Sequence, residues 1–171
     1  MITLIAGASH TGKTALAQRL LEQNGWPYLS LDHLKMGLIR SGYTSLTVKD
    51  DDALTALMWP IVREMIKTAI ENEQHMVIEG CYLPFDWRKD FSSEYLPHIR
   101  FVCLVMTQRY IREHFADIRA HASVVENRGD DPELDMDVLL LDNAQNLEAC
   151  RRHDCVVILI DGEYRVALPP C

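Results

Sequence analysis

Short, nearly continuous runs of apolar residues alternate along the chain with longer segments that have a helical pattern. The runs are rich in Val, Ile and Leu, which is typical of strands that helices cover on both faces. We therefore expect five strands of a parallel sheet, at Thr3–Ala6, Tyr28–Leu31, Met76–Glu79, Arg100–Met106 and Cys155–Ile160. This alternation predicts a three-layer α/β fold with right-handed crossovers and with helices on both faces of the sheet.

The segments between the expected strands carry apolar side chains at spacings of three and four residues. In the first of them, Leu16 and Leu20 share one face of the predicted helix. A longer helical pattern covers residues 54–69, and another covers residues 136–147. Pro60 falls inside the pattern at 54–69, so we expect either a kink there or the start of a second helix.

The segment between the first expected strand and the first expected helix matches the phosphate-loop pattern G-x-x-x-x-G-K-[ST] at every fixed position. It reads Gly7-Ala8-Ser9-His10-Thr11-Gly12-Lys13-Thr14. The two glycines allow a tight turn whose N–H groups point at phosphate oxygens, next to the positive end of the helix dipole. Lys13 would reach the β- and γ-phosphates, and the Thr14 hydroxyl would bind Mg²⁺. The pattern predicts binding of a nucleoside triphosphate, but it does not separate a kinase from a switch, a motor or a synthetase.

Functional side chains of an open α/β sheet gather at the carboxyl ends of its strands. Asp32 follows the second expected strand, where it could accept a proton from a substrate hydroxyl, bind Mg²⁺ through water, or cap the next helix. Glu79 ends the third expected strand and suits a place behind the first ligands of Mg²⁺, although it could equally be a surface carboxylate. Gly80 would leave room for substrate beside the loop, and His33 is either a substrate contact or a plain helix-surface residue.

The helix expected over Gln108–His121 separates basic from apolar side chains. Arg109, Arg112 and Arg119 share one arc, and Arg128 follows in a loop with an acidic end. Arginines can stabilise the charge that spreads over a phosphoryl group in transfer, and a loop with Arg128 could close over bound nucleotide. We take Arg109 and Arg128 as candidates for catalysis and Arg112 as a candidate for substrate binding. The alternative is a solvated helix face stabilised only by pairing with nearby carboxylates.

Composition narrows the class of partner. The chain has 171 residues and a formal net charge of −8, which argues against nucleic acid as a partner. The opening apolar run, Ile2 to Ala6, is too short for a signal peptide or a membrane span, so we expect no membrane association. The five cysteines show neither metal-ligand spacing nor a CxxC pair, and we expect a reducing, cytoplasmic location.

These motifs together resemble those of the P-loop kinase group that includes adenylate kinases, shikimate and gluconate kinases, and zeta-toxin-like proteins. The resemblance covers nearly the whole chain, through GASHTGKT, YLSLDHL, MVIEG and the lid-like ENRGDD. It implies a five-stranded parallel sheet in the order 2-3-1-4-5. It also implies one kinase domain over residues 1–171, with a substrate-binding region at approximately residues 32–97 and a mobile lid at approximately residues 119–135.

The same resemblance implies roles for single residues. Lys13 and Thr14 would bind phosphate and metal, Asp32 would act as a base or metal partner, and Arg128 would be a lid arginine. The chain departs from adenylate kinases after the third expected strand, where it reads Glu79-Gly80-Cys81-Tyr82-Leu83-Pro84. Adenylate kinases usually have Asp-Gly and a Phe-Pro-Arg-like run there, so Tyr82 is a candidate for a different acceptor pocket. The lid segment lacks a cysteine quartet, and no structural zinc is expected.

The sequence favours an ATP- and Mg²⁺-dependent kinase that acts on a small-molecule hydroxyl or phosphate. A nucleoside monophosphate kinase is the alternative within that class. From a different class, a regulatory nucleotide-binding module with slow hydrolysis stays open. A GTPase switch is disfavoured because the chain has no Asn-Lys-x-Asp guanine signature. Whether the protein is a monomer or a homodimer is left open.

Overall fold

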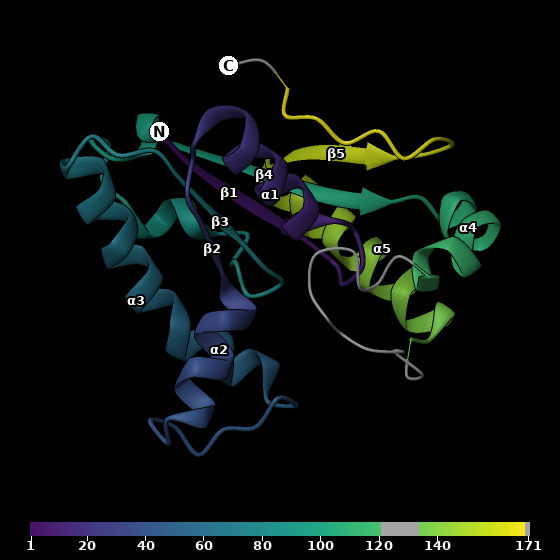
Figure 1. The fold of residues 1–171 in the computed structure, drawn as a ribbon, viewed down its shortest axis with the longest axis horizontal. Coiled ribbons are helices and arrows are strands. Elements are labelled where there is room, and N and C mark those ends of the chain that lie inside the picture. The colour runs from purple at the N-terminus through teal and green to yellow at the C-terminus, as the bar shows by residue number, and fades with distance from the viewer. Residues whose placement is uncertain (121–133, 170–171) are drawn as a thin grey trace.

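The computed structural model describes residues 1–120 and 134–169. Arg128 and most of the predicted lid, residues 119–135, therefore lie outside the described residues. The strands are β1 (Ile2–Gly7), β2 (Tyr28–Ser30), β3 (Met76–Glu79), β4 (Ile99–Met106) and β5 (Val156–Ile160) (Figure 1). The α-helices are α1 (Lys13–Asn24), α2 (Leu31–Arg40), α3 (Asp51–Glu71), α4 (Gln108–Ala120) and α5 (Met136–Arg152), and the 3-10 helices are η1 (Trp87–Asp90) and η2 (Leu96–His98).

The five strands form one parallel sheet in the order β2-β3-β1-β4-β5, as the family resemblance implied. Every predicted strand is present, with ends that differ by at most one residue from the prediction. The second strand ends at Ser30 because Leu31 already begins α2. The register sets Ile5 of β1 and Ser30 of β2 on either side of Glu79 in β3. The carboxyl ends of these three strands therefore lie together at one edge of the sheet.

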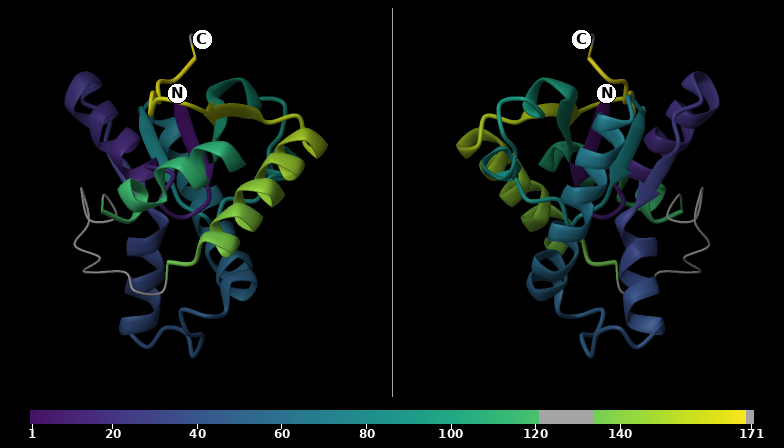
Figure 2. Two further views of the ribbon diagram at one scale, coloured as in Figure 1. Left: turned by 90° about the vertical axis from the view of Figure 1, so that its right-hand side faces the viewer. Right: turned by 90° about the vertical axis from the view of Figure 1, so that its left-hand side faces the viewer.

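Helices cover both faces of the sheet (Figure 2). Along β4, alternate side chains point to opposite faces, as the pleat of a strand requires. Cys103 packs with Met58 of α3 and Cys150 of α5 on one face. Leu104 packs with Leu16 of α1 and with α4 on the other. The continuous apolar runs in the sequence follow from this coverage of both faces.

One helix, α3, passes through Pro60, so the second helix that we considered at this residue does not form. Proline has no N–H, and the Ala56 carbonyl therefore loses its partner within the helix. Both Ala56 and Pro60 are exposed, so water can reach that carbonyl. Among the described helices, none combines the length and the apolar character that crossing a membrane needs.

Replacing Leu104 should weaken the whole sheet. Its side chain is fully buried, and Leu104→Ala should lower the free energy of unfolding by about 2–5 kcal/mol through lost burial and a residual cavity. Leu159→Ala is the matched control, because Leu159 lies on the neighbouring β5 with 52% exposure and should cost less than about 1 kcal/mol. Urea unfolding measures both. Equal losses for the two variants would contradict the assigned burial.

Candidate functional site

The predicted phosphate loop, residues 7–14, connects β1 directly to α1, whose first residue is Lys13. Gly12 has a left-handed backbone with φ of 84°, a conformation that side chains with a Cβ rarely adopt. A Cβ at Gly12 would also lie 1.7 Å from the Tyr164 hydroxyl oxygen. The backbone conformation thus favours glycine at this position, and a Cβ would in addition require the Tyr164 ring to move.

Three hydrogen bonds hold the loop in its curled shape. The Lys13 Nζ and the Thr11 Oγ1 both donate to the Ala8 carbonyl, each at 2.8 Å. The Tyr164 hydroxyl donates to the Thr11 carbonyl at 3.1 Å, from the segment that follows β5. Lys13 is only 6% exposed, so its ammonium is held inside the loop. An ammonium and the backbone N–H groups of a helix start form a positive concavity that suits phosphate oxygens.

The structure brings together two of the predicted metal candidates, Thr14 and Glu79. The Thr14 Oγ1 donates to the Glu79 Oε1 at 3.2 Å. Glu79 is 1% exposed, so the alternative of a surface carboxylate is wrong. Within residues 1–120 and 134–169, no three His, Cys, Asp or Glu side chains are grouped to hold a metal ion. A hydroxyl beside a buried carboxylate nevertheless fits Mg²⁺, which takes few protein ligands and completes its shell with phosphate and water.

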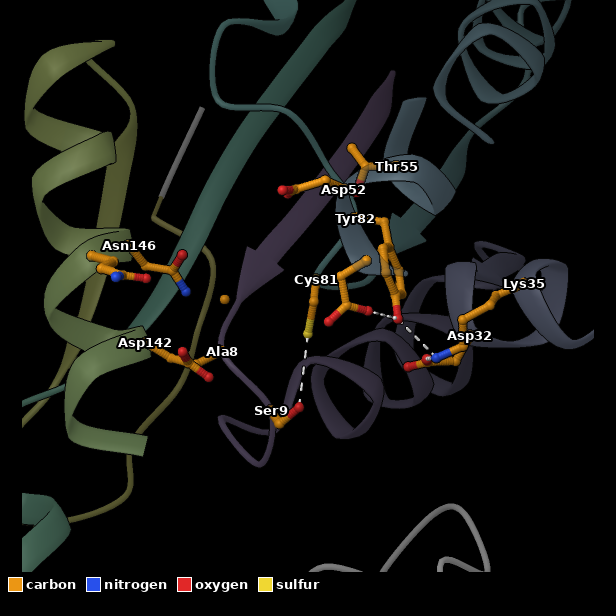
Figure 3. Close-up of a pocket in the computed structure, with 13 residues that line it drawn as sticks. Ala8, Ser9, Asp32, Lys35, Asp52, Thr55, Cys81, Tyr82, Asp142 and Asn146 are labelled. Atoms are coloured by element: carbon orange, nitrogen blue, oxygen red, sulfur yellow. Dashed lines mark hydrogen bonds and ion pairs between the residues drawn. The ribbon is translucent and has the colours of Figure 1, made fainter. Parts of the chain in front are cut away.

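Asp32, the third predicted metal candidate, lies in the first turn of α2 and lines a cavity with the phosphate loop. The N-cap residue of this helix is Ser30, so Asp32 does not have the capping role that we considered. The Asp32 Oδ1 accepts from Lys35 Nζ at 2.6 Å. Lys35 also donates to the Tyr82 hydroxyl at 2.9 Å, and that hydroxyl donates to Asp51 at 2.9 Å (Figure 3). A chain of four polar side chains thus joins α2, α3 and the segment after β3.

Burial and hydrogen bonding both affect the pKa values in this hydrogen-bonded series. Burial lowers the pKa of Lys35, but its hydrogen bonds to Asp32 and Tyr82 outweigh that effect and raise the pKa overall. Burial is also the main cause that raises the pKa of Tyr82 to about 12. Both groups therefore keep their protons at neutral pH, and the order of donors and acceptors along the chain is fixed.

The cavity beside the phosphate loop has a volume of about 670 Å³, which is in the range of small-molecule sites. The loop contributes residues 7–9, and α2 and α3 with the segment after β3 form one wall. α5 forms the opposite wall, from which Asp142 and Asn146 extend (Figure 3). The predicted residues Asp32 and Tyr82 both belong to the lining.

Several predicted residues do not line this cavity. His33 is exposed on α2, and Arg112 is exposed on α4. A Cβ at Gly80 would lie 2.8 Å from the Leu31 Cβ, so this glycine makes room for a core side chain at the site where we expected room for substrate. Arg109 is exposed, and its Nη2 lies 2.9 Å from the Asp161 Oδ1 beyond β5. The hydrogen bond from Arg109 is the main cause that lowers the pKa of Asp161.

The sequence did not single out much of the lining. The residues concerned are Lys35, Asp51, Asp52, Thr55, Cys81, Asp142, Gln145 and Asn146. The last three follow an i, i+3, i+4 spacing and so share one face of α5, but an exposed helix face looks the same in a sequence. Tyr164 was also missed, since it lies in the irregular segment that follows β5.

Two known structures with a similar fold are kinases. The sequence matches no protein-family model and no curated protein. A gluconokinase from Sinorhizobium meliloti 1021 is 17% identical, with a TM-score of 0.51 over 94% of this chain and 83% of the kinase. A deoxyadenosine kinase from M. mycoides is 10% identical, with a TM-score of 0.52 over 94% of this chain and 90% of that one. At such low identity the likeness establishes the fold alone, a parallel sheet in the order β2-β3-β1-β4-β5 with helices on both faces.

Gly12→Ala should abolish the shape of the phosphate loop. The methyl group meets both the left-handed backbone and the Tyr164 hydroxyl, so affinity for a non-hydrolysable ATP analogue should fall at least about tenfold. Gly37→Ala is the control, because this helical glycine has open space around a Cβ. It should leave affinity unchanged and raise stability by about 0.5–1 kcal/mol. Calorimetric titration and thermal unfolding measure the two effects. Unchanged affinity in Gly12→Ala would contradict the loop geometry.

Proposed function

We propose that the chain is an ATP-dependent phosphotransferase for a hydroxyl or phosphate oxygen of a small molecule. One observation carries the proposal. The phosphate loop, through residues 7–9, and Asp32 line one cavity that is large enough for a small-molecule acceptor. A module that only binds or slowly hydrolyses nucleotide has no need for an acceptor space beside the phosphate loop. The kinase fold supports the same proposal.

Different groups of the protein would bind different parts of the triphosphate and its Mg²⁺. Backbone N–H groups of the loop and of the α1 start would bind the phosphate oxygens. Lys13 would exchange the Ala8 carbonyl, its present acceptor at 2.8 Å, for phosphate oxygens. The Thr14 hydroxyl, with Glu79 behind it, would hold Mg²⁺, which neutralises charge on the phosphates when bound.

Asp32 would act on the acceptor. When the acceptor is a hydroxyl compound, its oxygen bonds to the γ-phosphorus while the bond from that phosphorus to the β–γ bridging oxygen breaks. The hydroxyl proton passes to an Asp32 carboxylate oxygen, and ADP leaves. Lys35, at 2.6 Å, orients the carboxylate for this step.

The structure describes Arg109 but not Arg128, the two arginines proposed for catalysis. Arg109 is paired with Asp161 and does not line the cavity, so its proposed catalytic role would require its side chain to leave Asp161. Arg128, which lies outside the described residues, keeps its proposed role as a lid arginine.

Lys13→Ala should weaken nucleotide binding even without an acceptor. The loss of a charge-assisted contact with phosphate should raise the dissociation constant of an ATP analogue with Mg²⁺ by about 10–100-fold. Lys49→Ala removes an exposed lysine and should have no effect. Calorimetric titration measures both, and circular dichroism checks the fold of each variant. Full affinity in Lys13→Ala would refute the proposed nucleotide site.

Asp32→Asn should separate catalysis from nucleotide binding. The transfer rate should fall about 10²–10⁴-fold, as for loss of a general base, while affinity for the ATP analogue changes little. The readout is label transferred from γ-labelled ATP into a small-molecule extract of the cells that make the protein. Asp154→Asn, an exposed change remote from the cavity lining, serves as the control. A rate equal to that of the control would remove Asp32 from the mechanism.

A further inference from the structure

The cavity beside the phosphate loop carries an excess of negative charge. In the described part of the chain its charged lining consists of four carboxylates and one ammonium, those of Asp32, Asp51, Asp52, Asp142 and Lys35. No arginine or histidine belongs to this described lining. The rest of the lining is mostly small or amide-bearing, so it neither cancels the charge nor makes the cavity apolar.

The one lysine is already engaged within the wall. Lys35 is 13% exposed, and its ammonium donates to Asp32 and to the Tyr82 hydroxyl at 2.6 and 2.9 Å. Its charge is balanced by Asp32, while the Tyr82 hydroxyl donates to Asp51. An anionic acceptor would therefore find no uncommitted cation in this wall, and the carboxylates of Asp51, Asp52 and Asp142 remain as surplus charge.

Two of the surplus carboxylates extend from opposite walls. Asp52 lies in the first turn of α3, and Asp142 lies on α5 across the cavity (Figure 3). Among the described residues, neither has a hydrogen-bond or ion-pair partner. Burial and, second, the charge of Asp51 raise the pKa of Asp142, which means that the two walls repel each other electrostatically. A positive group between the walls would relieve this repulsion.

We propose that the acceptor is a small hydroxyl compound with a protonated amine, such as an amino sugar or an amino alcohol. This inference rests on the kinase function proposed above. The ammonium lies between Asp52 and Asp142, and the reacting hydroxyl faces Asp32 and the phosphate loop. Thr55, Gln145 and Asn146 offer hydrogen bonds to further hydroxyl groups of the same molecule.

The same wall disfavours the anionic acceptors. A sugar acid or a nucleoside monophosphate brings a carboxylate or a phosphate, which proteins bind with the paired N–H groups of arginine. Here such a group would meet like charges, of which the half-buried Asp142 is screened less by water than the exposed Asp51 and Asp52. The charge of the wall thus narrows the proposed acceptor, from a hydroxyl or phosphate compound in general to a cationic alcohol.

Fractionation of candidate acceptors by charge tests the proposal. A small-molecule extract of the cells that make the protein is divided by ion exchange into cationic, neutral and anionic pools. Each pool is incubated with the wild-type protein, Mg²⁺ and γ-labelled ATP, and label in the products is counted. The count includes every labelled product other than ATP and inorganic phosphate, nucleoside diphosphates among them, and we expect incorporation from the cationic pool. Incorporation confined to the neutral or anionic pool would overturn the charge inference while leaving the kinase function intact. Incorporation from no pool would overturn the kinase function itself.

Neutral variants of the two walls give a second, independent readout. Asp52→Asn and Asp142→Asn should each raise KM for the cationic acceptor about tenfold, because each removes one charge that faces the ammonium. Affinity for the ATP analogue, measured without acceptor, should change far less. Glu148→Gln is the matched control, since Glu148 is an exposed acid on α5 outside the cavity lining. An unchanged or lower KM in both aspartate variants would contradict the proposed ammonium position.

Discussion

The turn from β1 into α1 is the constraint on which the site depends. The chain leaves a fully buried strand and must begin a helix at Lys13, with the left-handed Gly12 between them. The hydrogen bonds of Lys13 and Thr11 to the same carbonyl fix the curl of this turn. Tyr164 closes it from outside, which ties the segment after β5 to the start of α1. The positive concavity of the loop thus combines backbone N–H groups, which the turn orients, with the Lys13 ammonium that the turn holds inside it.

The parallel pairing of β1 with its neighbouring strands brings other functional side chains next to this turn. Because β1 lies between β3 and β4, whatever follows β3 must lie beside the phosphate loop. The register places Glu79 next to Ile5, and its buried carboxylate then reaches the Thr14 hydroxyl. The cost of burying a carboxylate is offset here by a hydroxyl that donates to it, and any cation bound at Thr14 would offset it further. The same edge of the sheet carries Asp32 at the start of α2.

The charge of the cavity lining bears on the acceptor, which the net charge of the chain does not. A formal charge of −8 over the chain says only that nucleic acid is a poor partner. Within the cavity, the same sign is concentrated on opposed walls, with the ammonium of Lys35 already paired. In the proposed function the charge of the wall would favour a cationic group in the cavity. The phosphate loop beside it would bind an anion, the triphosphate.

The sequence by itself determined the phosphate loop, the five strands and the coverage of both faces of the sheet. These features depend on residues that are neighbours in the chain, through turn geometry and periodic burial. It also placed Asp32 at the end of the second strand and Tyr82 in the segment after the third strand, and both line the cavity. Only the tertiary structure decided that Asp142, from a distant helix, opposes Asp52, and that Arg109 pairs with Asp161 away from the cavity. The sequence of a helix does not reveal which side chains lie opposite its polar residues, because those side chains come from other elements that meet only when the sheet has assembled.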